Sequence, residues 1–500
     1  MTEPVLVVGA GPVGMTAALH LARHGVPSVL LEAAATRSAV GSRSICVQGD
    51  VLDILDRVGA GWPVVAAGVT WYSGRIHYRE HEVVRLALPE TPPGRFPAFV
   101  NTPQTVVERI LADLVAASPL IDLRVGRRVT GLTQDEAGVT ATTENGMTAR
   151  GTHCIAADGA HSTVRGLLGL PFDGTSYDDK FLITDIRAEL DRAPERRFYF
   201  DPEWNPGRQV LLHPQPDSVW RIDWQVPEDF DLAAERAGGG LDRRVRHVVG
   251  EVDYEVVWAS VYRFHQRRVP RMTVGRVLLA GDAAHVMSPF GARGMNSGIA
   301  DAENAAWKIA AIRTGWGAPT LLSTYDTERG AAAAENLRVT GKTMRFLVPA
   351  TPEDHARRVD VLTRSVHDPQ ARAQIDSGRL AEPFWYLDSP LTTPAPAEAL
   401  ARFPTAPGAP RPPVPGVLCP DLPLADGRRL RPALGPRLTL LTAATTPHDW
   451  PHVEPAPSAL TTLGMGPEGV AVLRPDGYLA AILPDGKGVA EAIARTTGHH

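Results

Sequence analysis

A glycine pattern near the start of the chain restricts the fold more than any other feature. Gly9, Gly11 and Gly14 have the spacing Gly-x-Gly-x-x-Gly, after an apolar run over residues 4–9 and before a helical pattern over 14–24. The first glycine permits a tight turn, and the second lets the backbone approach a pyrophosphate. The third lets the helix pack closely on the strand. The pattern predicts a βαβ unit that binds a dinucleotide.

A second apolar run, over residues 28–32, supplies the expected partner strand and ends in Glu32. A carboxylate at this place suits the ribose hydroxyls of an adenosine, and the alternative is a solvated acid at a strand end. The motif by itself does not distinguish FAD from NAD.

Composition excludes several classes of protein. At about 100–200 residues per domain, 500 residues predict about three domains. The net charge of −5 and the absence of a Lys/Arg run argue against nucleic acid and membrane partners, and no apolar run reaches the roughly 18 residues that span a bilayer. Cys46, Cys154 and Cys419 are far apart and odd in number, which argues against disulfides and metal sites and suits the cytoplasm.

Two further apolar runs end in an Asp–Gly or Gly–Asp pair. The first leads to Asp158 and Gly159, and the second leads from Val277 to Asp282. In an α/β sheet the carboxyl ends of the strands open into the ligand crevice. Both pairs are therefore candidate site residues, with capping of the following turn as the alternative for Asp158.

The second of these pairs precedes a glycine-containing loop and a clear helix over residues 296–312. Asp282 can accept a hydrogen bond from a polyol such as the ribityl chain of FAD. The helix N-terminus favours the negative charge of a reduced flavin. The expected donors are Asn296 and the backbone N–H groups of Gly294 and Met295.

The middle and the end of the chain have other patterns. Residues 209–213 and 218–226 are rich in alternating and in β-branched or aromatic residues, which predicts a hairpin or a meander in an antiparallel sheet. A second helix is expected over 331–347. Many prolines over 389–416 predict a linker before a small α/β module.

With all three motifs in order, roughly residues 1–388 resemble the single-component FAD-dependent aromatic hydroxylases, the group of p-hydroxybenzoate hydroxylase. Within the group the chain is most similar to 3-(3-hydroxyphenyl)propionate hydroxylases and bacterial polyketide hydroxylases. The resemblance implies an α/β fold with a Rossmann-like FAD-binding domain, an antiparallel-sheet substrate domain and a small thioredoxin-like C-terminal domain. The implied ranges are 1–70, 104–175 and 272–388 for the FAD-binding domain with its following helices, 71–103 and 176–271 for the substrate domain, 389–408 for the linker and 409–500 for the C-terminal domain.

The resemblance also assigns roles to residues. It implies that the ADP half of FAD is held by Gly9, Gly11, Gly14 and Glu32. It further implies FAD contacts from Arg43 and Gln104, contacts with FAD and the nicotinamide donor from Asp158 and Gly159, a ribityl ligand in Asp282, and a place beside the flavin for Pro289. Two residues depart from the family pattern: His161 stands where a basic residue is frequent, and Arg293 where glutamine is common.

The implied reaction places one oxygen atom of O2 on a small phenolic or polyketide-like aromatic through a C4a-hydroperoxyflavin. FAD is expected to be tight and non-covalent. NAD(P)H, with NADPH favoured, is expected to visit transiently, because the resemblance implies no second dinucleotide domain and the chain has no second convincing Gly-x-Gly-x-x-Gly motif. The sequence does not identify the general base; the candidates are His213, Tyr72, Tyr199, Tyr262 and Arg293.

Other features of the substrate domain and the tail remain open. Trp220 and Trp224 are candidate walls of the substrate site, and Arg221 suits either a substrate carboxylate or an exposed strand face. The tail lacks a CxxC motif, so we expect packing or homodimer formation from it, and a competent flavin site without it. The same scaffold also suits Baeyer–Villiger oxidation, epoxidation or non-oxygenating flavin oxidoreduction, and a non-catalytic FAD-binding protein is a further alternative.

Overall fold

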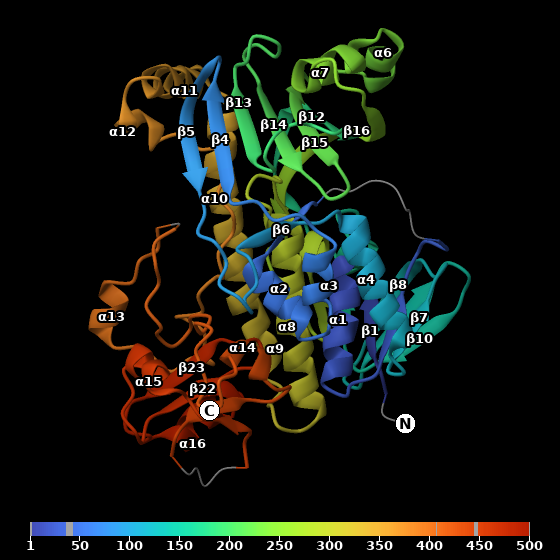
Figure 1. The fold of residues 1–500 in the computed structure, drawn as a ribbon. Helices are drawn as coiled ribbons and strands as arrows, with labels where there is room; N and C mark the ends of the chain where they lie inside the picture. The colour runs from blue at the N-terminus through green and yellow to red at the C-terminus, as the bar shows by residue number, and fades with distance from the viewer. Residues whose placement is uncertain (1–2, 37–43, 407, 445–448, 500) are drawn as a thin grey trace.

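Three sheets organise the computed structural model, which describes residues 3–36, 44–406, 408–444 and 449–499. In Figure 1 the eight-stranded sheet occupies the upper part of the molecule, and the six-stranded sheet lies at the lower right. The C-terminal residues, in red, lie at the lower left around a four-stranded sheet. Among the described helices, none combines the length and apolar character that crossing a bilayer requires.

The six-stranded sheet has the order β17-β18-β11-β1-β2-β7 and is parallel except between β17 and β18. Its strands are β1 (Val5–Val8), β2 (Ser28–Leu31), β7 (Ile121–Arg124), β11 (Cys154–Ala156), β17 (Thr273–Val274) and β18 (Val277–Leu279). The residues of β1, β2, β11 and β18 are all buried, as expected for a parallel sheet covered on both faces. The three motifs follow β1, β11 and β18, so they meet at one edge.

Helices cover this sheet, and α1 packs against α8 through the centre of the molecule (Figure 1). The helices of this region are α1 (Pro12–Arg23), α2 (Gly49–Asp56), α3 (Gly61–Ala66), α4 (Gln104–Ala117), α5 (Thr163–Leu167), α8 (Arg293–Arg313), α9 (Leu321–Tyr325) and α10 (Ala331–Leu347). Smaller sheets add β3 (Cys46–Gln48) with β6 (Phe99–Asn101), and β8 (Val129–Gln134), β9 (Val139–Thr143) and β10 (Thr148–Gly151). The helices predicted over 14–24, 296–312 and 331–347 are all present, with small shifts at their ends.

The eight-stranded sheet has the order β19-β16-β12-β15-β14-β13-β4-β5, and all its pairs except β13–β4 are antiparallel. Its strands are β4 (Ser73–Tyr78), β5 (His81–Ala87), β12 (Asp173–Arg187), β13 (Arg196–Phe200), β14 (Gln209–Pro214), β15 (Val219–Val226), β16 (Glu255–Arg268) and β19 (His285–Val286). The predicted hairpin is β14–β15. Helices α6 (Leu232–Ala237) and α7 (Gly240–Val249) lie on one side, α11 (Pro352–Ser365) and α12 (Pro369–Arg372) near the other end.

The C-terminal region contains a four-stranded sheet of order β21-β20-β22-β23. Its elements are α14 (Leu430–Ala433), β20 (Thr439–Thr442), β21 (His452–Val453), α15 (Pro457–Leu463), β22 (Val470–Leu473), β23 (Leu479–Leu483) and α16 (Val489–Thr496). The proline-rich stretch before it includes α13 (Ala397–Ala401) and is not a free tether: Leu391 is buried, and the Thr393 N–H donates to Ala480 O at 2.8 Å.

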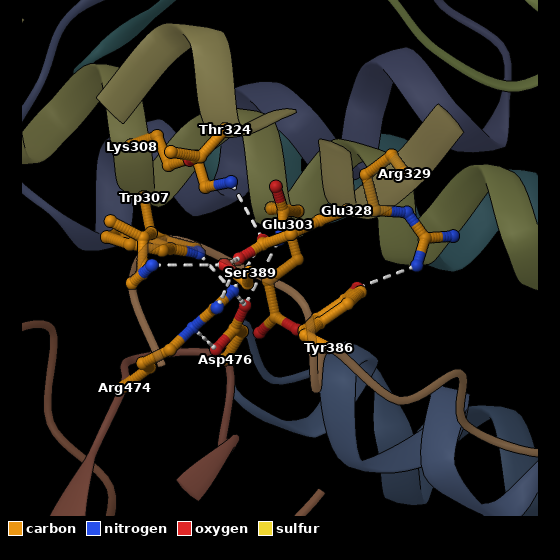
Figure 2. A network of polar contacts seen from close by, with 12 residues as sticks. Glu303, Trp307, Lys308, Thr324, Glu328, Arg329, Tyr386, Ser389, Arg474 and Asp476 are labelled. Atoms are coloured by element: carbon orange, nitrogen blue, oxygen red, sulfur yellow. Dashed lines mark hydrogen bonds and ion pairs between the residues drawn. The ribbon is translucent and has the colours of Figure 1, made fainter. Parts of the chain in front are cut away.

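A buried polar network joins this region to the rest of the molecule (Figure 2). Arg474, which follows β22, donates two hydrogen bonds to the Glu328 carboxylate, and Lys308 Nζ lies 2.8 Å from Glu328 Oε2. Asp476 accepts from the Trp307 indole N–H at 3.0 Å. Because all these side chains are buried, the contact desolvates several charges at once, and each needs its partner.

The network continues toward the motif after β18. Arg329, next to Glu328 in the π-helical turn between α9 and α10, donates to Asp301 Oδ1 at 2.6 Å. Asp301 Oδ2 in turn accepts from the Gly281 backbone N–H at 3.0 Å and lies 2.7 Å from His285 Nε2. The partner of His285 is therefore Asp301, in a buried structural contact.

Candidate active site

One cavity of about 1460 Å³ lies between the carboxyl edge of the six-stranded sheet and a face of the eight-stranded sheet. The glycine loop after β1, the loop after β18 and the start of α8 form one wall. Asp421 and Arg431 of the C-terminal region also line the cavity. The chain thus brings its three motifs and its antiparallel sheet to a single space.

The three glycines of the first motif differ in their surroundings. At Gly9, where φ is +97°, a Cβ atom would lie 2.4 Å from Ala157 O, and at Gly14 a Cβ would lie 1.8 Å from Gly9 O. Gly11 lines the cavity, and no heavy atom lies within 4 Å of the place where its Cβ would be. This open cradle at the N-terminus of α1 fits a pyrophosphate.

Glu32 follows β2 and holds the same loop. Its carboxylate accepts hydrogen bonds from the backbone N–H groups of Ala10 at 2.8 Å and Ala34 at 2.7 Å. The acid thus lies beside the glycine turn, where the adenosine half of a dinucleotide is expected.

The loop after β18 and the start of α8 line the cavity as expected, through Asp282, Pro289, Gly294 and Met295. A Cβ on Gly294 would meet no atom within 4 Å, which leaves space for a ligand at the helix N-terminus. The side chain of Asn296 lies elsewhere: its amide donates to Cys46 O and Ala292 O and accepts from the Gln48 N–H. It fastens α8 to β3 and does not line the cavity.

The two residues of the Asp–Gly motif after β11 face different surroundings: Gly159 lines the cavity, and Asp158 does not. Gly159, with φ of +79°, lines the cavity and faces open space. Asp158 accepts hydrogen bonds from Ser162 Oγ and from the Val164 N–H at 3.0 Å, so its carboxylate caps α5. The capping alternative therefore describes the geometry of Asp158.

Of the two remaining cofactor candidates, Gln104 and Arg43, only Gln104 belongs to the described residues. Gln104 lines the cavity at the start of α4, and its Oε1 accepts from the Ser44 N–H at 3.3 Å. Arg43 lies outside the described residues.

Only three of the five candidate catalytic residues line the cavity: His213, Tyr262 and Arg293. Tyr72 is 39% exposed and points elsewhere, while Tyr199 stacks on His77 with ring centroids 4.9 Å apart. For Tyr199, alternation along β13 decides this, because neighbouring side chains of a strand emerge on opposite faces and Arg196 of the same strand lines the cavity.

Arg293 and His213 differ in what they can do. The Arg293 guanidinium donates to Asn336 Oδ1 and to the carbonyls of Arg379 and Leu380, so it fastens that segment to the start of α8. Burial lowers the pKa of Arg293 to about 10. Burial, and then the charges of Arg196 and Arg221, lower the pKa of His213 well below its ordinary value, so its imidazole is neutral at pH 7.

The structure corrects two expectations about β15. Trp220 and Trp224 do not form cavity walls, because they pack on α7 on the opposite face of the sheet. Arg221 is not on an exposed face: it is 2% exposed, lines the cavity and donates to both oxygens of Asp185 at 2.7 and 2.8 Å.

Sequence reasoning missed Asp223 and Arg196, which also line the cavity. Burial raises the pKa of Asp223 to about 7, against the opposing effects of Arg221 and Arg196. The signal was the alternation in β15, where charged residues at 221 and 223 separate buried apolar ones. No group of three or more His, Cys, Asp or Glu side chains suited to a metal ion occurs within the described ranges.

Basic side chains gather on another part of the cavity lining: His161, Arg165, Arg263, His265 and Arg267. Arg263 pairs with Asp178 at 3.0 Å and Glu228 at 3.6 Å. Burial lowers the pKa of His265, and the charges of Arg267, Arg263 and His161 lower it further. Such a concentration of positive charge favours an anionic ligand.

Comparisons with known proteins place this site in a family. Residues 2–340 match the model of a family described as FAD binding domain. The chain is 30% identical to a 6-methylpretetramide 4-monooxygenase of Streptomyces rimosus, over 95% of this chain and 90% of that protein. It is 32% identical to a dialkyldecalin synthase of Streptomyces rugosporus, over 67% and 71%.

A 3-(3-hydroxy-phenyl)propionate/3-hydroxycinnamic acid hydroxylase of Paraburkholderia xenovorans is 31% identical over 67% of this chain, and the match spans only about half, 54%, of that protein. Among solved structures, the fold is similar to that of the flavin-dependent monooxygenase PieE in complex with FAD and substrate. The TM-score is 0.84 at 24% identity, over 100% of both chains. The chain therefore belongs to the family of FAD-dependent aromatic hydroxylases that this FAD binding domain defines.

Proposed function

We propose that the protein hydroxylates a small aromatic compound, phenolic or polyketide-like, with NAD(P)H, favouring NADPH, and O2. The observation that carries the proposal is the single cavity in which the flavin-binding loops and a buried polar sheet face are opposed. The relatives that act on 6-methylpretetramide and on hydroxyphenylpropionate support this substrate class. Bound FAD supplies the redox and oxygen chemistry.

The residues of this chain hold and shield that chemistry. Gly11 and Glu32 serve the ADP half, and Asp282 and the N-terminus of α8 serve the ribityl chain and the isoalloxazine ring. Arg43, Gln104, Gly159 and Pro289 remain proposed cofactor contacts. The basic cluster around Arg267 supports an anionic nicotinamide donor, and its density of positive charge favours NADPH over NADH.

For the domain organisation we keep the ranges predicted from the sequence, with 409–500 as a thioredoxin-like domain. The strand order β21-β20-β22-β23, with β20 parallel to β21 and antiparallel to β22, supports this assignment. Three buried, free cysteines suit a reducing compartment such as the cytoplasm. Homodimer formation stays a prediction, to be tested by light scattering.

The test uses the FAD-loaded enzyme with NADPH and two phenols, 6-methylpretetramide and 3-(3-hydroxyphenyl)propionate. NADPH oxidation, hydrogen peroxide and product mass are measured together. We expect stimulated NADPH oxidation and a product that gains one oxygen atom and one phenolic hydroxyl. A ring-expanded or epoxide product contradicts hydroxylation, and NADPH oxidation with peroxide alone supports a non-oxygenating flavin oxidoreductase.

A further inference from the structure

One face of the eight-stranded sheet forms the wall of the cavity opposite the flavin-binding loops. Alternate positions on three adjacent strands reach it, in accord with the period of two along a strand. These side chains are Phe181 and Ile183 on β12, Arg221 and Asp223 on β15, and Leu211 and His213 on β14. In the strand register Asp223 lies opposite Ile183 on one side and Leu211 on the other, so an acid is framed by apolar side chains.

The carboxyl group of Asp223 has an unused acceptor. Its Oδ1 is buried and accepts no hydrogen bond from any residue that the structure describes. Buried polar atoms in folded proteins nearly always have a partner. An unpartnered oxygen in a cavity wall therefore points to a ligand that donates a hydrogen bond there.

The groups around Asp223 explain why this acid can exchange a proton near neutral pH. On its own strand Arg221 is paired with Asp185 of β12. From β13, the Arg196 guanidinium donates to Ser377 O at 2.7 Å. Burial, and the negative charge of Asp185, raise the pKa of Asp223 to about 7, while Arg221 and Arg196 lower it.

The other titratable groups at this wall are His213 on β14, Tyr262 on β16 and Cys46 on β3. His213 is neutral at pH 7 because its pKa is well below its ordinary value, which makes it a weak base. Burial raises the pKa of the Cys46 thiol to about 12, so it stays protonated. A general base is most effective when its pKa lies near the working pH, and this favours Asp223.

We propose that Asp223 is the catalytic base that removes the proton of the substrate's phenolic hydroxyl, an assignment that rests on the proposed hydroxylation of a phenol. The phenolic O–H bond breaks and an O–H bond forms on the carboxylate. The electron pair stays on the phenolate oxygen, so the total charge of the cavity is unchanged. The phenolate is the stronger carbon nucleophile, and the proton returns when the product leaves.

The test compares wild type with Asp223→Asn, using 3-(3-hydroxyphenyl)propionate, or 6-methylpretetramide if wild type converts only that compound. The carboxylate exists above its pKa, so the wild-type kcat should rise with pH around 7. A simple phenol ionises only near pH 10, so free substrate does not cause this rise. Asp223→Asn should lose the rise and lower kcat about 10²–10⁴-fold, with a much smaller change in KM.

Asp185→Asn is the second variant, because Asp185 does not line the cavity. Removing its charge takes away a like charge and the carboxylate partner of Arg221, and both effects lower the pKa of Asp223. We expect the pH-dependent rise to be kept but displaced to lower pH. FAD content is measured for each variant. If Asp223→Asn loses flavin, the test relies on Asp185→Asn, and a shift of its kcat rise to lower pH supports Asp223 as the base.

The outcomes are distinguishable. A wild-type enzyme that oxygenates neither phenol overturns the proposed function and the base with it. A wild-type enzyme that hydroxylates, together with an Asp223→Asn enzyme that keeps the same rise with pH, overturns the base alone. An unmoved rise in Asp185→Asn also counts against Asp223.

Discussion

At the scale of single residues, Gly11 and Gly14 should respond differently to the same change. A valine at 11 projects into the open cradle, so Gly11→Val should fold with a near wild-type Tm and lose FAD affinity by about two orders of magnitude or more. A valine at 14 meets Gly9 O, 1.8 Å from its Cβ, so Gly14→Val should lower Tm as well. Thermal melts and FAD titrations on the same preparations check this. A Gly11→Val protein that binds FAD like wild type would refute the cradle.

At the scale of elements, β16 carries two of the arginines of the proposed NADPH site, Arg263 and Arg267. Arg267 donates to Ser176 Oγ and has no carboxylate partner among the described residues, whereas Arg263 already pairs with Asp178 and Glu228. Arg267→Gln should raise the KM for NADPH about tenfold, with an effect that shrinks at high salt, and leave FAD affinity unchanged. Arg263→Gln is the matched control and should change KM less. The KM for NADPH of both variants is measured by steady-state kinetics at two salt concentrations. Equal changes in KM in the two variants would argue against an NADPH site at Arg267.

At the scale of the whole molecule, the C-terminal region is part of the fold and not a dispensable tail. Removing 409–500 would strip Arg474 and Asp476 from the buried network, so we expect an insoluble or FAD-poor protein, contrary to the expectation from sequence. The milder Arg474→Met leaves Lys308 as the remaining cationic partner of Glu328 among the described residues and should cost about 3–5 kcal/mol. Lys487→Met removes the exposed pair with Asp485 and should leave Tm unchanged. Calorimetry compares the two variants. Equal melting temperatures would show that the buried network around Arg474 does not stabilise the contact between the C-terminal region and the rest of the molecule.

The sequence by itself determined the parts whose physics is local. The β1–α1–β2 unit follows from glycines at 9, 11 and 14, because the turn at Gly9 and the contact between Gly14 and Gly9 lie within a few residues. The hairpin of β14 and β15 follows from the strand-forming residues of both segments and from the alternation in β15, and the FAD-binding loops follow from motifs at strand ends. These features predicted the FAD cofactor and several of the residues that line the cavity.

Only the tertiary structure decided which face of β15 meets the cavity. Alternation groups Arg221 with Asp223 and separates both from Trp224, but it does not say which group faces solvent, a core or a ligand. That choice depends on α7 covering the tryptophans, and on β12, whose Asp185 binds Arg221 from 36 residues away in sequence. The docking of the C-terminal region depends in the same way on Arg474 finding a buried acid 146 residues away in sequence. Burial and partner choice of charged groups are long-range properties, so a sequence pattern leaves them open until the chain is folded.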